Sequence, residues 1–399
     1  MTPSSPTSRP KVLFLPRWYP NRTDPMPGLF IRRHAFAVSG FCKVAVLYVH
    51  KDQKSDAGHY EIQHTDEPAF FEIRAYYGAS KLPFRFMASF INAYRFFIAH
   101  RKGFQIIRKE FGKPDLLHVN VLTRIGCLAL IYRIFSGVPY VITEHWTRYL
   151  PGMQSYKGWF RKQLTKLVVK HASAVMPVTL NLQLAMQKHG LNNANYHVIP
   201  NVVDTRLFTP AEDAGNFSRK MFLHVSCFDD NQKNISGMLR VLKALSEKRQ
   251  DWLCTMAGDG KDLQKMLAYA EQLRLKDSFV IFTGLKENQE LASLMQQALF
   301  QVLFSRYENL PVVIPESFAC GVPFLSSDVG GIAEHINEET GMLVKSEDET
   351  ALLAGLEYML DHAAKFDRHT IRQYAVDHFS REVIGKQINS VYKQVLQQK

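Results

Sequence analysis

The sequence predicts two tandem α/β domains, each a doubly wound sheet with helices on both faces, and three observations lead to this fold class. Short apolar runs alternate with segments of helical periodicity along the whole 399-residue chain. The apolar runs are continuous rather than alternating, which is typical of parallel strands buried on both faces. The length suits two domains of about 150 to 200 residues each.

The first half begins with a polar, Pro- and Ser-rich lead-in at residues 1–10, which we expect to be disordered. Strands are then predicted at residues 11–16, 43–50, 115–121, 139–145, 172–179 and 196–201. Helices are predicted at residues 28–40, 125–137 and from about residue 180 to Gly190. The turn at Gly137-Val138-Pro139 is typical of a helix that returns to a parallel strand. These elements form a first domain over residues 11–205.

The second half repeats the pattern. Strands are predicted at residues 220–226, 252–258, 278–284, 299–305, 322–327 and 341–345. A strongly amphipathic helix is predicted at residues 235–249, and further helical stretches follow the strands. The linker is expected near residues 201–210, so that the second domain covers residues 206–379.

The net charge of +12 is divided unevenly between the two halves. Residues 1–200 hold 27 Lys or Arg and 10 Asp or Glu, a balance of +17, whereas residues 201–399 have a balance of −5. A basic half predicts an anionic partner, for which nucleic acid, an anionic membrane and a phosphorylated substrate are the candidates. The five scattered cysteines form no CxxC pair, which favours a reduced, cytoplasmic protein without a disulfide framework or a zinc site.

Ligands of doubly wound sheets bind beyond the carboxyl ends of the strands, where this chain reads "SRYENLPVVIPESFACGVPFLSSDVGG" from Ser305 to Gly331. Pro311 fits an early helical position, and the free N–H groups of that first turn could bind a diphosphate. Glu308 and Glu316 suit an elongated ligand with an anionic middle and hydroxyls at both ends. A nucleotide-diphosphate sugar has that form. The alternative is a helix-cap acid at Glu308 and a solvated helix residue at Glu316.

The order of "IPNVVD", "AGDGKDL", "SRYENLPVVIPESFACGVPFLSSDVGGIAEHI" and "TGMLV" resembles the donor-binding domain of the family 4 retaining glycosyltransferases of the GT-B architecture. The resemblance implies two Rossmann-like domains that face each other across a cleft, whose closure would exclude water. It also implies that a C-terminal helix, about residues 380–399, packs back on the first domain. A UDP- or GDP-sugar would be the donor, and a glycan or a lipid-pyrophosphate-linked molecule the acceptor, in polysaccharide synthesis without a metal or other cofactor.

The resemblance also implies roles for single residues. Glu308 would contact the hydroxyls of the donor sugar and Glu316 those of the ribose. The turn between them and the later glycine pair would line the donor site, which adds Asn309, Leu310, Pro311, Val312, Gly330 and Gly331. A simple tight turn is the alternative for the two glycines.

A leaving diphosphate needs fixed positive charge. The family supplies an Arg and a Lys after the first strand of the second domain, and Lys233 fits the lysine role. Cys227 stands at the arginine position, so Arg306 or Lys286 would have to supply the second charge. Each of these three cations has an ordinary surface position as its alternative.

In the first domain, the resemblance places His145 beside the donor sugar and assigns Asn120 to the substrate site. Gly28 would allow the backbone to approach the phosphates or the acceptor closely. An unremarkable buried or surface histidine is the alternative for His145.

Two segments combine aromatic and basic residues. Residues 81–113 hold eight Lys or Arg and one acid, and residues 156–171 are similar. Such helices can lie on an anionic bilayer, so we hypothesise peripheral association with the inner face of a membrane. The alternative is a packing helix with a solvated basic edge. No run of about 18 uninterrupted apolar residues predicts a transmembrane helix.

Two rival functions remain open. A nucleotide-sugar epimerase of the same architecture would act on the donor without an acceptor. A nucleic-acid-binding protein would fit the basic composition, although the sequence contains no recognisable nucleic-acid recognition motif. The favoured hypothesis is a glycosyltransferase that does not bind nucleic acid.

Overall fold

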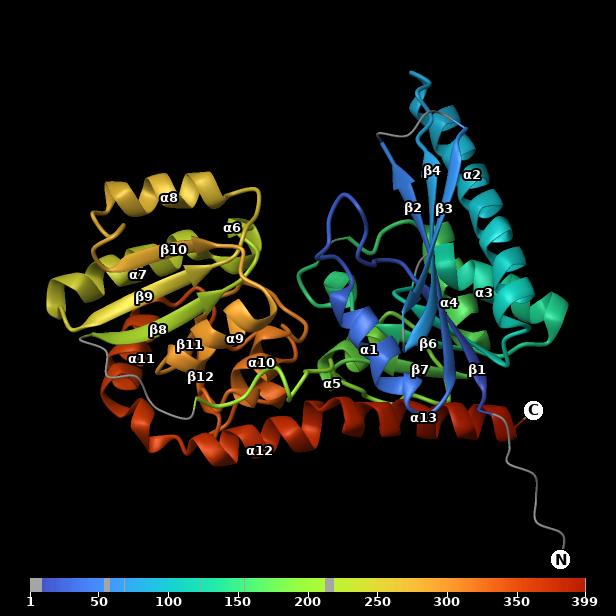
Figure 1. Ribbon diagram of the computed structural model, residues 1–399. Coiled ribbons are helices and arrows are strands. Elements are labelled where there is room, and N and C mark those ends of the chain that lie inside the picture. The colour runs from blue at the N-terminus through green and yellow to red at the C-terminus, as the bar shows by residue number, and fades with distance from the viewer. Residues whose placement is uncertain are drawn as a thin grey trace, which may run out of the picture. The chain divides into compact units, whose positions relative to one another are not determined.

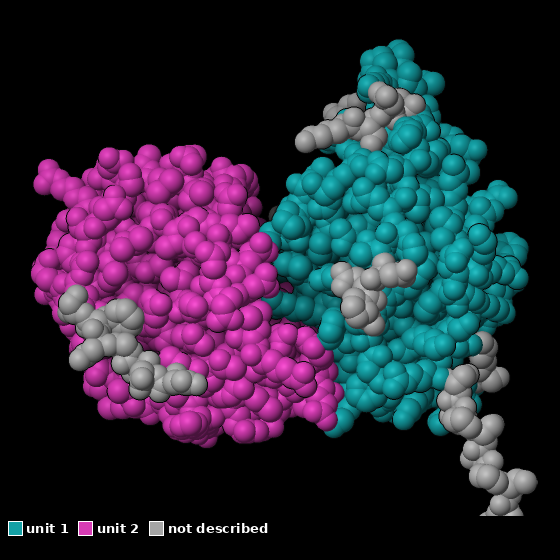
Figure 2. Space-filling model, in the orientation of Figure 1, with its two compact units in different colours: residues 1–178, 183–199, 384–399 teal, residues 179–182, 200–383 magenta. Residues whose placement is uncertain are grey.

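The computed structural model describes residues 9–53, 58–67, 69–122, 124–153, 155–211 and 219–398 (Figure 1). The predicted lead-in therefore lies almost wholly outside the described residues. The chain divides into two compact units (Figure 2). Unit 1 comprises residues 1–178, 183–199 and 384–399, and unit 2 comprises residues 179–182 and 200–383. Each unit contains one sheet.

The sheet of unit 1 has seven strands in the order β3-β4-β2-β1-β5-β6-β7, and all neighbours are parallel except β3 and β4. The strands are β1 (Lys11–Pro16), β2 (Lys43–Asp52), β3 (Tyr60–Glu67), β4 (Phe70–Gly78), β5 (Leu116–Asn120), β6 (Tyr140–Glu144) and β7 (Ala174–Pro177). The chain leaves β1 toward β2 on one side and later continues from β5 to β7 on the other. The strand order therefore reverses between β1 and β5, the position where such sheets bind ligands.

Helices cover both faces of this sheet, as right-handed crossovers require. They are α1 (Leu29–Ser39), α2 (Arg85–Ile106), α3 (Arg124–Ser136), α4 (Trp159–His171), α5 (Leu180–Lys188) and α13 (Arg381–Gln397). Figure 1 shows α2, α3 and α4 together on one side of the strands and α1 on the other. These three helices, α2, α3 and α4, thus form one layer on this face of the sheet.

The C-terminal helix is attached to unit 1 by a buried hydrogen-bonded chain. The Tyr392 hydroxyl lies 2.6 Å from Nδ1 of His118, and the hydroxyl of Thr143 lies 2.6 Å from Nε2 of the same ring. Burial lowers the pKa of His118 well below its usual value, so the ring is neutral and each nitrogen has one partner. His118 is therefore a core residue that joins β5, β6 and α13.

The sheet of unit 2 has six parallel strands in the order β10-β9-β8-β11-β12-β13. The strands are β8 (Lys220–Val225), β9 (Trp252–Ala257), β10 (Val280–Gly284), β11 (Gln301–Leu303), β12 (Phe324–Ser327) and β13 (Gly341–Val344). The helices are α6 (Asp230–Lys233), α7 (Ile235–Lys248), α8 (Leu263–Gln272), α9 (Asn288–Gln297), α10 (Val313–Ala319), α11 (Glu349–His362) and α12 (Arg368–Phe379). The strand order of this sheet reverses between β8 and β11.

Two parts of the fold differ from the sequence prediction. The strand predicted at residues 196–201 forms only a short parallel pairing beside β7, in which His197 and Ile199 donate their N–H groups to the carbonyls of Val175 and Pro177. The hairpin of β3 and β4 was not predicted, because its polar and charged edge strand β3 lacks an apolar run. Among the described residues, no helix is both long and apolar enough to cross a membrane.

Candidate active site

The carboxyl ends of β8 and β11 bring together two residues that the sequence singled out separately. Lys233 ends the short helix α6 after β8, and Glu308 lies in the loop after β11. Their side chains form an ion pair between Nζ of Lys233 and Oε1 of Glu308. The pair lies where the strand order reverses, which is the expected ligand position of a doubly wound sheet.

Both members of this pair are buried, with exposed fractions of 7% for Lys233 and 5% for Glu308. The Ser305 hydroxyl donates a 2.8 Å hydrogen bond to Oε1 of Glu308, and the Gln232 amide donates a 3.3 Å bond to Oε2. Burial opposes the charge on Lys233, but the surrounding groups, of which the Glu308 carboxylate is the foremost, together outweigh it and keep the lysine pKa above its usual value. The site therefore holds a charged ammonium in a region of low dielectric.

The loop after β9 braces the segment that carries Lys233. Phe228 donates its backbone N–H to the Asp259 carbonyl, and the Asp262 carboxylate accepts the N–H of Asp230 at 2.8 Å. A Cβ on Gly260 would lie 2.6 Å from the Phe228 nitrogen, so only glycine fits this approach. The Gly258-Asp259-Gly260 turn thus supports the neighbouring loop through its backbone and does not direct a side chain to the site.

Arg306 also braces this segment. Its guanidinium donates to the Asp230 carbonyl and to the Asn234 side chain, both at 2.6 Å, and to Glu347 at 2.7 Å. It caps the carbonyl end of α6, as arginines often do. Lys286 pairs with Glu290 at 2.9 Å. The proposed second phosphate cation at either position stays a prediction, and both side chains already have acidic partners.

The helix after Glu308 begins later than predicted. α10 begins at Val313, and Pro311 lies in a turn before it, where its carbonyl accepts the N–H of Ile314 at 3.2 Å. Pro315 therefore lies in the first helical turn, in which the N–H groups have no partner within the helix. Glu316 also belongs to that turn and is 2% exposed.

The residues between the two glutamates divide into a core side and an outer side. Leu310 is buried in the hydrophobic core of unit 2, and its carbonyl accepts a 2.9 Å hydrogen bond from the Asn201 amide. Pro311 and Val312 are half-buried. A donor contact of Leu310 would therefore come from its backbone, whereas Pro311 and Val312 also expose side-chain atoms.

The glycine pair packs directly on the Glu308 loop. Gly330 has φ +62°, and a Cβ there would lie 1.9 Å from the Glu308 carbonyl oxygen. Gly331 donates its N–H to the Asn309 carbonyl at 3.0 Å, and the Asn309 amide oxygen accepts a 2.8 Å bond from the Thr179 hydroxyl. The two glycines therefore fix the position of the Glu308 backbone through direct contacts. A simple tight turn would not require these contacts.

In unit 1, the predicted His145 follows β6 and lies among aromatic rings. Its ring centroid is 4.5 Å from that of Phe30 and 5.5 Å from that of His34, both on α1. Trp18 packs edge-on against Trp146 at 5.2 Å. Sequence reasoning named neither tryptophan, although each lies within two residues of the end of a predicted strand.

Gly28 and Asn120 lie in the same unit. Gly28 precedes α1 with φ +76°, and a Cβ there would lie 2.2 Å from the Trp18 carbonyl oxygen. Glycine is thus required at position 28 because the backbone there passes close to the loop after β1. Asn120 ends β5 and is completely buried; its amide donates to the His118 carbonyl at 3.3 Å, while its Oδ1 has no partner among the described residues. A substrate contact of either residue stays a prediction.

Glu144, the residue before His145, holds the loops after β5 and β6 together. Its buried carboxylate accepts backbone N–H groups from Leu122, His145 and Trp146 at 2.8, 2.9 and 2.9 Å. Burial raises the pKa of Glu144 to about 7, although these three N–H donors favour the ionised form. Sequence reasoning did not name this residue because its role depends on backbone groups of a distant loop.

The raised pKa of Glu144 predicts a pH-dependent stability. The folded protein binds this proton more tightly, so the contribution favours folding below the ordinary value of 4.5 and is lost as the pH rises to about 7. For Glu144 alone, the free energy of unfolding should fall by up to about 3 kcal/mol across that window. Urea unfolding of Glu144→Gln at pH 5 to 8 should show a flatter dependence, whereas Glu110→Gln, at an exposed carboxylate, should keep the original slope. Equal slopes in all three proteins would contradict the assignment.

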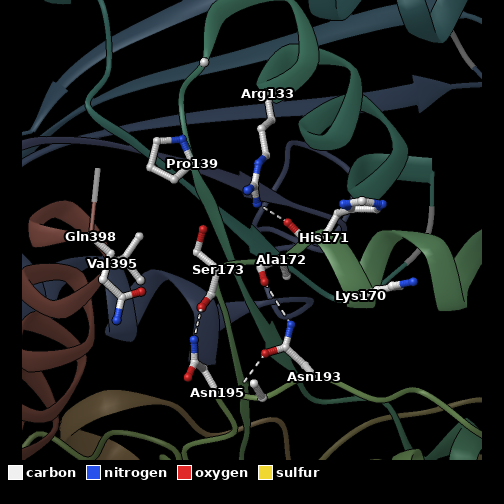
Figure 3. A pocket seen from close by; sticks show the side chains of 12 residues that line it. Arg133, Pro139, Lys170, His171, Ala172, Ser173, Asn193, Asn195, Val395 and Gln398 are labelled. Atoms are coloured by element: carbon white, nitrogen blue, oxygen red, sulfur yellow. Dashed lines mark hydrogen bonds between the residues drawn. The ribbon is translucent and has the colours of Figure 1, made fainter.

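A hollow of about 350 Å³ lies at the opposite edge of the unit 1 sheet (Figure 3). Pro139 and Ser173, which precede β6 and β7, line it. Arg133 donates to the His171 carbonyl at the end of α4, and the Asn193 amide donates to the Ala172 carbonyl at 2.8 Å. These groups cap a helix at the amino ends of the strands, so the hollow is not the predicted ligand site.

Comparisons with known proteins match two successive parts of the chain to two family descriptions. The family described as "Glycosyltransferase Family 4" matches residues 47–207, and the family described as "Glycosyl transferases group 1" matches residues 212–377. The chain is 26% identical over 311 residues to the MMP alpha-(1->4)-mannosyltransferase of Mycolicibacterium hassiacum, with 73% of each chain covered. It is 24% identical over 291 residues to the glycogen synthase of Mycobacterium tuberculosis, covering 70% of this chain and 69% of that protein.

Solved structures show the same fold. A sucrose-phosphate synthase from Thermosynechococcus elongatus matches with a TM-score of 0.77 and 19% identity, over 98% of this chain and all of that one. The Anabaena protein HepE, solved in complex with UDP-glucose, matches with a TM-score of 0.71 and 16% identity, over 96% and 99% of the two chains.

Proposed function

This chain belongs to the group 1 glycosyl transferases of the GT-B fold and is a glycosyltransferase, and we propose that it is a retaining enzyme with a nucleotide-diphosphate sugar as donor. The acceptor in this proposal is a glycan or a lipid-pyrophosphate-linked molecule. The observation that carries the proposal is the buried Lys233–Glu308 pair at the reversal point of the second sheet.

The two residues of the pair suit the two groups that separate in the reaction, the diphosphate and the sugar. Fixed positive charge at Lys233 would stabilise the negative charge that develops on the departing diphosphate. Glu308 is an acceptor of hydrogen bonds, which a sugar hydroxyl can donate. We assign Glu316 to the ribose hydroxyls, and the backbone of Asn309, Gly330 and Gly331 to the space between. No metal takes part in this proposal, because Lys233 supplies the charge that a metal would otherwise supply.

In the retaining reaction, the bond from the sugar C1 to the diphosphate oxygen breaks, and the bond from the acceptor oxygen to C1 forms on the same face. The acceptor proton passes to the departing diphosphate, so that neither step requires a protein nucleophile. His145 is the residue of unit 1 that we expect to bind a sugar hydroxyl. The basic unit 1 would bind the anionic acceptor, and a lipid-linked acceptor would place the enzyme at the inner face of a membrane.

Nucleotide binding gives the first test. At a concentration a hundredfold above its dissociation constant, UDP or GDP should stabilise the protein by about 2.7 kcal/mol. The midpoint of thermal unfolding of the full chain should then rise by several degrees. Adenosine is the control, since it lacks the diphosphate. No shift with any nucleoside diphosphate would contradict the donor site.

A panel of nucleotide sugars then identifies the donor through release of the nucleoside diphosphate. Product anomers read by NMR distinguish retention from inversion, and activity unchanged by EDTA is expected. Conversion of the donor to an epimer without any acceptor would support the rival epimerase and overturn the transferase proposal.

A further inference from the structure

α2 exposes a stripe of aromatic side chains to solvent. Phe86, Phe90, Tyr94 and Phe97 follow one another at intervals of three or four residues, which places them on one face of a helix. All four are exposed, and Phe86 retains 86% of its accessible surface. A soluble surface seldom leaves several large apolar side chains in one patch, so the stripe marks a contact with something apolar.

The neighbouring helices on the same side of the sheet also expose large apolar side chains. Ile134 and Phe135 project from the end of α3, with Phe135 85% exposed, and Trp159 and Phe160 project from the start of α4, with Trp159 75% exposed. α3 packs on α4, since a Cβ on Gly126 would lie 2.8 Å from the Val168 side chain. Figure 1 shows the three helices on one side of the sheet. We define the aromatic face by these exposed residues: Phe86, Phe90, Tyr94, Phe97, Ile134, Phe135, Trp159 and Phe160.

A groove of about 410 Å³ between α2 and α3 adjoins this face. Phe104, Ile131 and Phe135 line it, so its wall is mostly hydrocarbon. Arg101 and Arg108 also line it: Arg101 lies on α2, four residues after Phe97, and Arg108 lies in the π-helical turn Ile107–Phe111 that follows α2. Both arginines are exposed. The groove therefore combines room for an apolar chain with two cations beside it.

We propose that the aromatic face, with Arg101 and Arg108, is the surface by which unit 1 docks on an anionic phospholipid bilayer. Exposed phenylalanines and a tryptophan suit the boundary between headgroups and acyl chains, and the arginines suit lipid phosphates. A second copy of this chain would present the identical patch, because a two-fold interface is self-complementary, and the residues of this patch include no carboxylate that could pair with the arginines. Charge complementarity thus favours the bilayer as the single occupant.

This inference specifies the membrane partner of the proposed function but does not depend on sugar transfer. Vesicle binding requires no donor or acceptor, so a failed donor panel and a failed vesicle assay are separate results. The expected association is peripheral, since the interaction uses side chains on the outside of folded helices.

The test is co-sedimentation of the full chain with two kinds of vesicle. One consists of phosphatidylcholine alone, and the other also contains about 30 mol % phosphatidylglycerol. The wild type should pellet with the anionic vesicles at low salt. The triple variant Phe86→Ser/Phe90→Ser/Phe135→Ser should lose at least about tenfold in the partition coefficient. The pair Arg101→Gln/Arg108→Gln should lose about fivefold per arginine on anionic vesicles only.

Matched controls come from exposed positions in unit 2. Leu285→Ser/Leu299→Ser/Tyr358→Ser removes three exposed apolar side chains, and Arg206→Gln/Lys265→Gln removes two exposed cations. Both controls should bind vesicles as the wild type does. Wild-type protein that stays in the supernatant at low salt would overturn the proposal, as would equal losses in the test and control variants. Dimerisation by light scattering that the triple variant abolishes, without vesicle binding, would assign the face to self-association instead.

Discussion

Replacement of Lys233 by methionine is expected to lower kcat/KM by about 10²- to 10³-fold, the range measured when one preorganised electrostatic contact to a developing charge is removed. Lys233 is buried beside Glu308 and is charged, so its field acts in a region where water screens little. The loss should lie mainly in kcat, because the diphosphate gains negative charge only as the sugar leaves. Steady-state kinetics with the donor found in the panel measure this directly.

The same substitution also affects stability, which has to be separated from chemistry. Lys233→Met leaves the Glu308 carboxylate buried without its cation, and breaking a buried pair in this way costs roughly 3–5 kcal/mol. The double variant Lys233→Met/Glu308→Gln replaces both charges and should recover most of that loss in urea unfolding. It should not recover activity. Recovered activity in the double variant would mean that the pair is structural and that the diphosphate is bound elsewhere.

Lys286→Met is the matched control for the missing second cation. Lys286 follows β10 and pairs with Glu290, which lies on α9. If that pairing is its whole role, kcat/KM should change by less than about twofold, since exposed pairs contribute little. A loss comparable to that of Lys233→Met would instead identify Lys286 as the partner that Cys227 does not supply.

The sequence predicted the strands of unit 2 well because each is a continuous apolar run with its own turn signals, as in β8 and β9. Those signals are local, so periodicity reveals them. β3 has no such run, and the position of its hairpin depends on β2, which hydrogen-bonds to β4. The Tyr196 segment does pair with β7, but its apolar run did not indicate that the pairing would be limited to a bridge.

The candidate site was predictable in its residue types but not in its contacts. Glu308 and Lys233 followed from motif order, yet their pairing spans 75 residues and depends on two strands being neighbours. Arg306 illustrates the limit more sharply. From sequence it is a plausible phosphate cation, but the fold directs its guanidinium to the carbonyl end of α6 and to Glu347. Only the tertiary structure reveals which cations already have partners.

The second large effect is expected at Gly330, because this glycine has two separate constraints. Its φ of +62° is one that side chains rarely adopt, and a Cβ would lie 1.9 Å from the Glu308 carbonyl oxygen. The first constraint costs an alanine roughly 1–2 kcal/mol. The second cannot be relieved by a rotamer change, since the contact is with backbone, so the Glu308 loop has to move. A displacement of about 1 Å at a reacting group can lower a rate about a hundredfold.

Gly284→Ala separates these constraints, because Gly284 has a similar φ of +69° but a Cβ there would meet no described atom within 4 Å. Both alanine variants should lose stability, but only Gly330→Ala should lose kcat/KM by about 10- to 100-fold. Steady-state kinetics and urea unfolding of the two variants measure the difference. A loss of activity in Gly284→Ala as large as in Gly330→Ala would show that backbone strain alone is responsible. Unchanged activity in both would mean that the position of Glu308 does not control the reaction, and the donor site would have to be sought away from the Lys233–Glu308 pair.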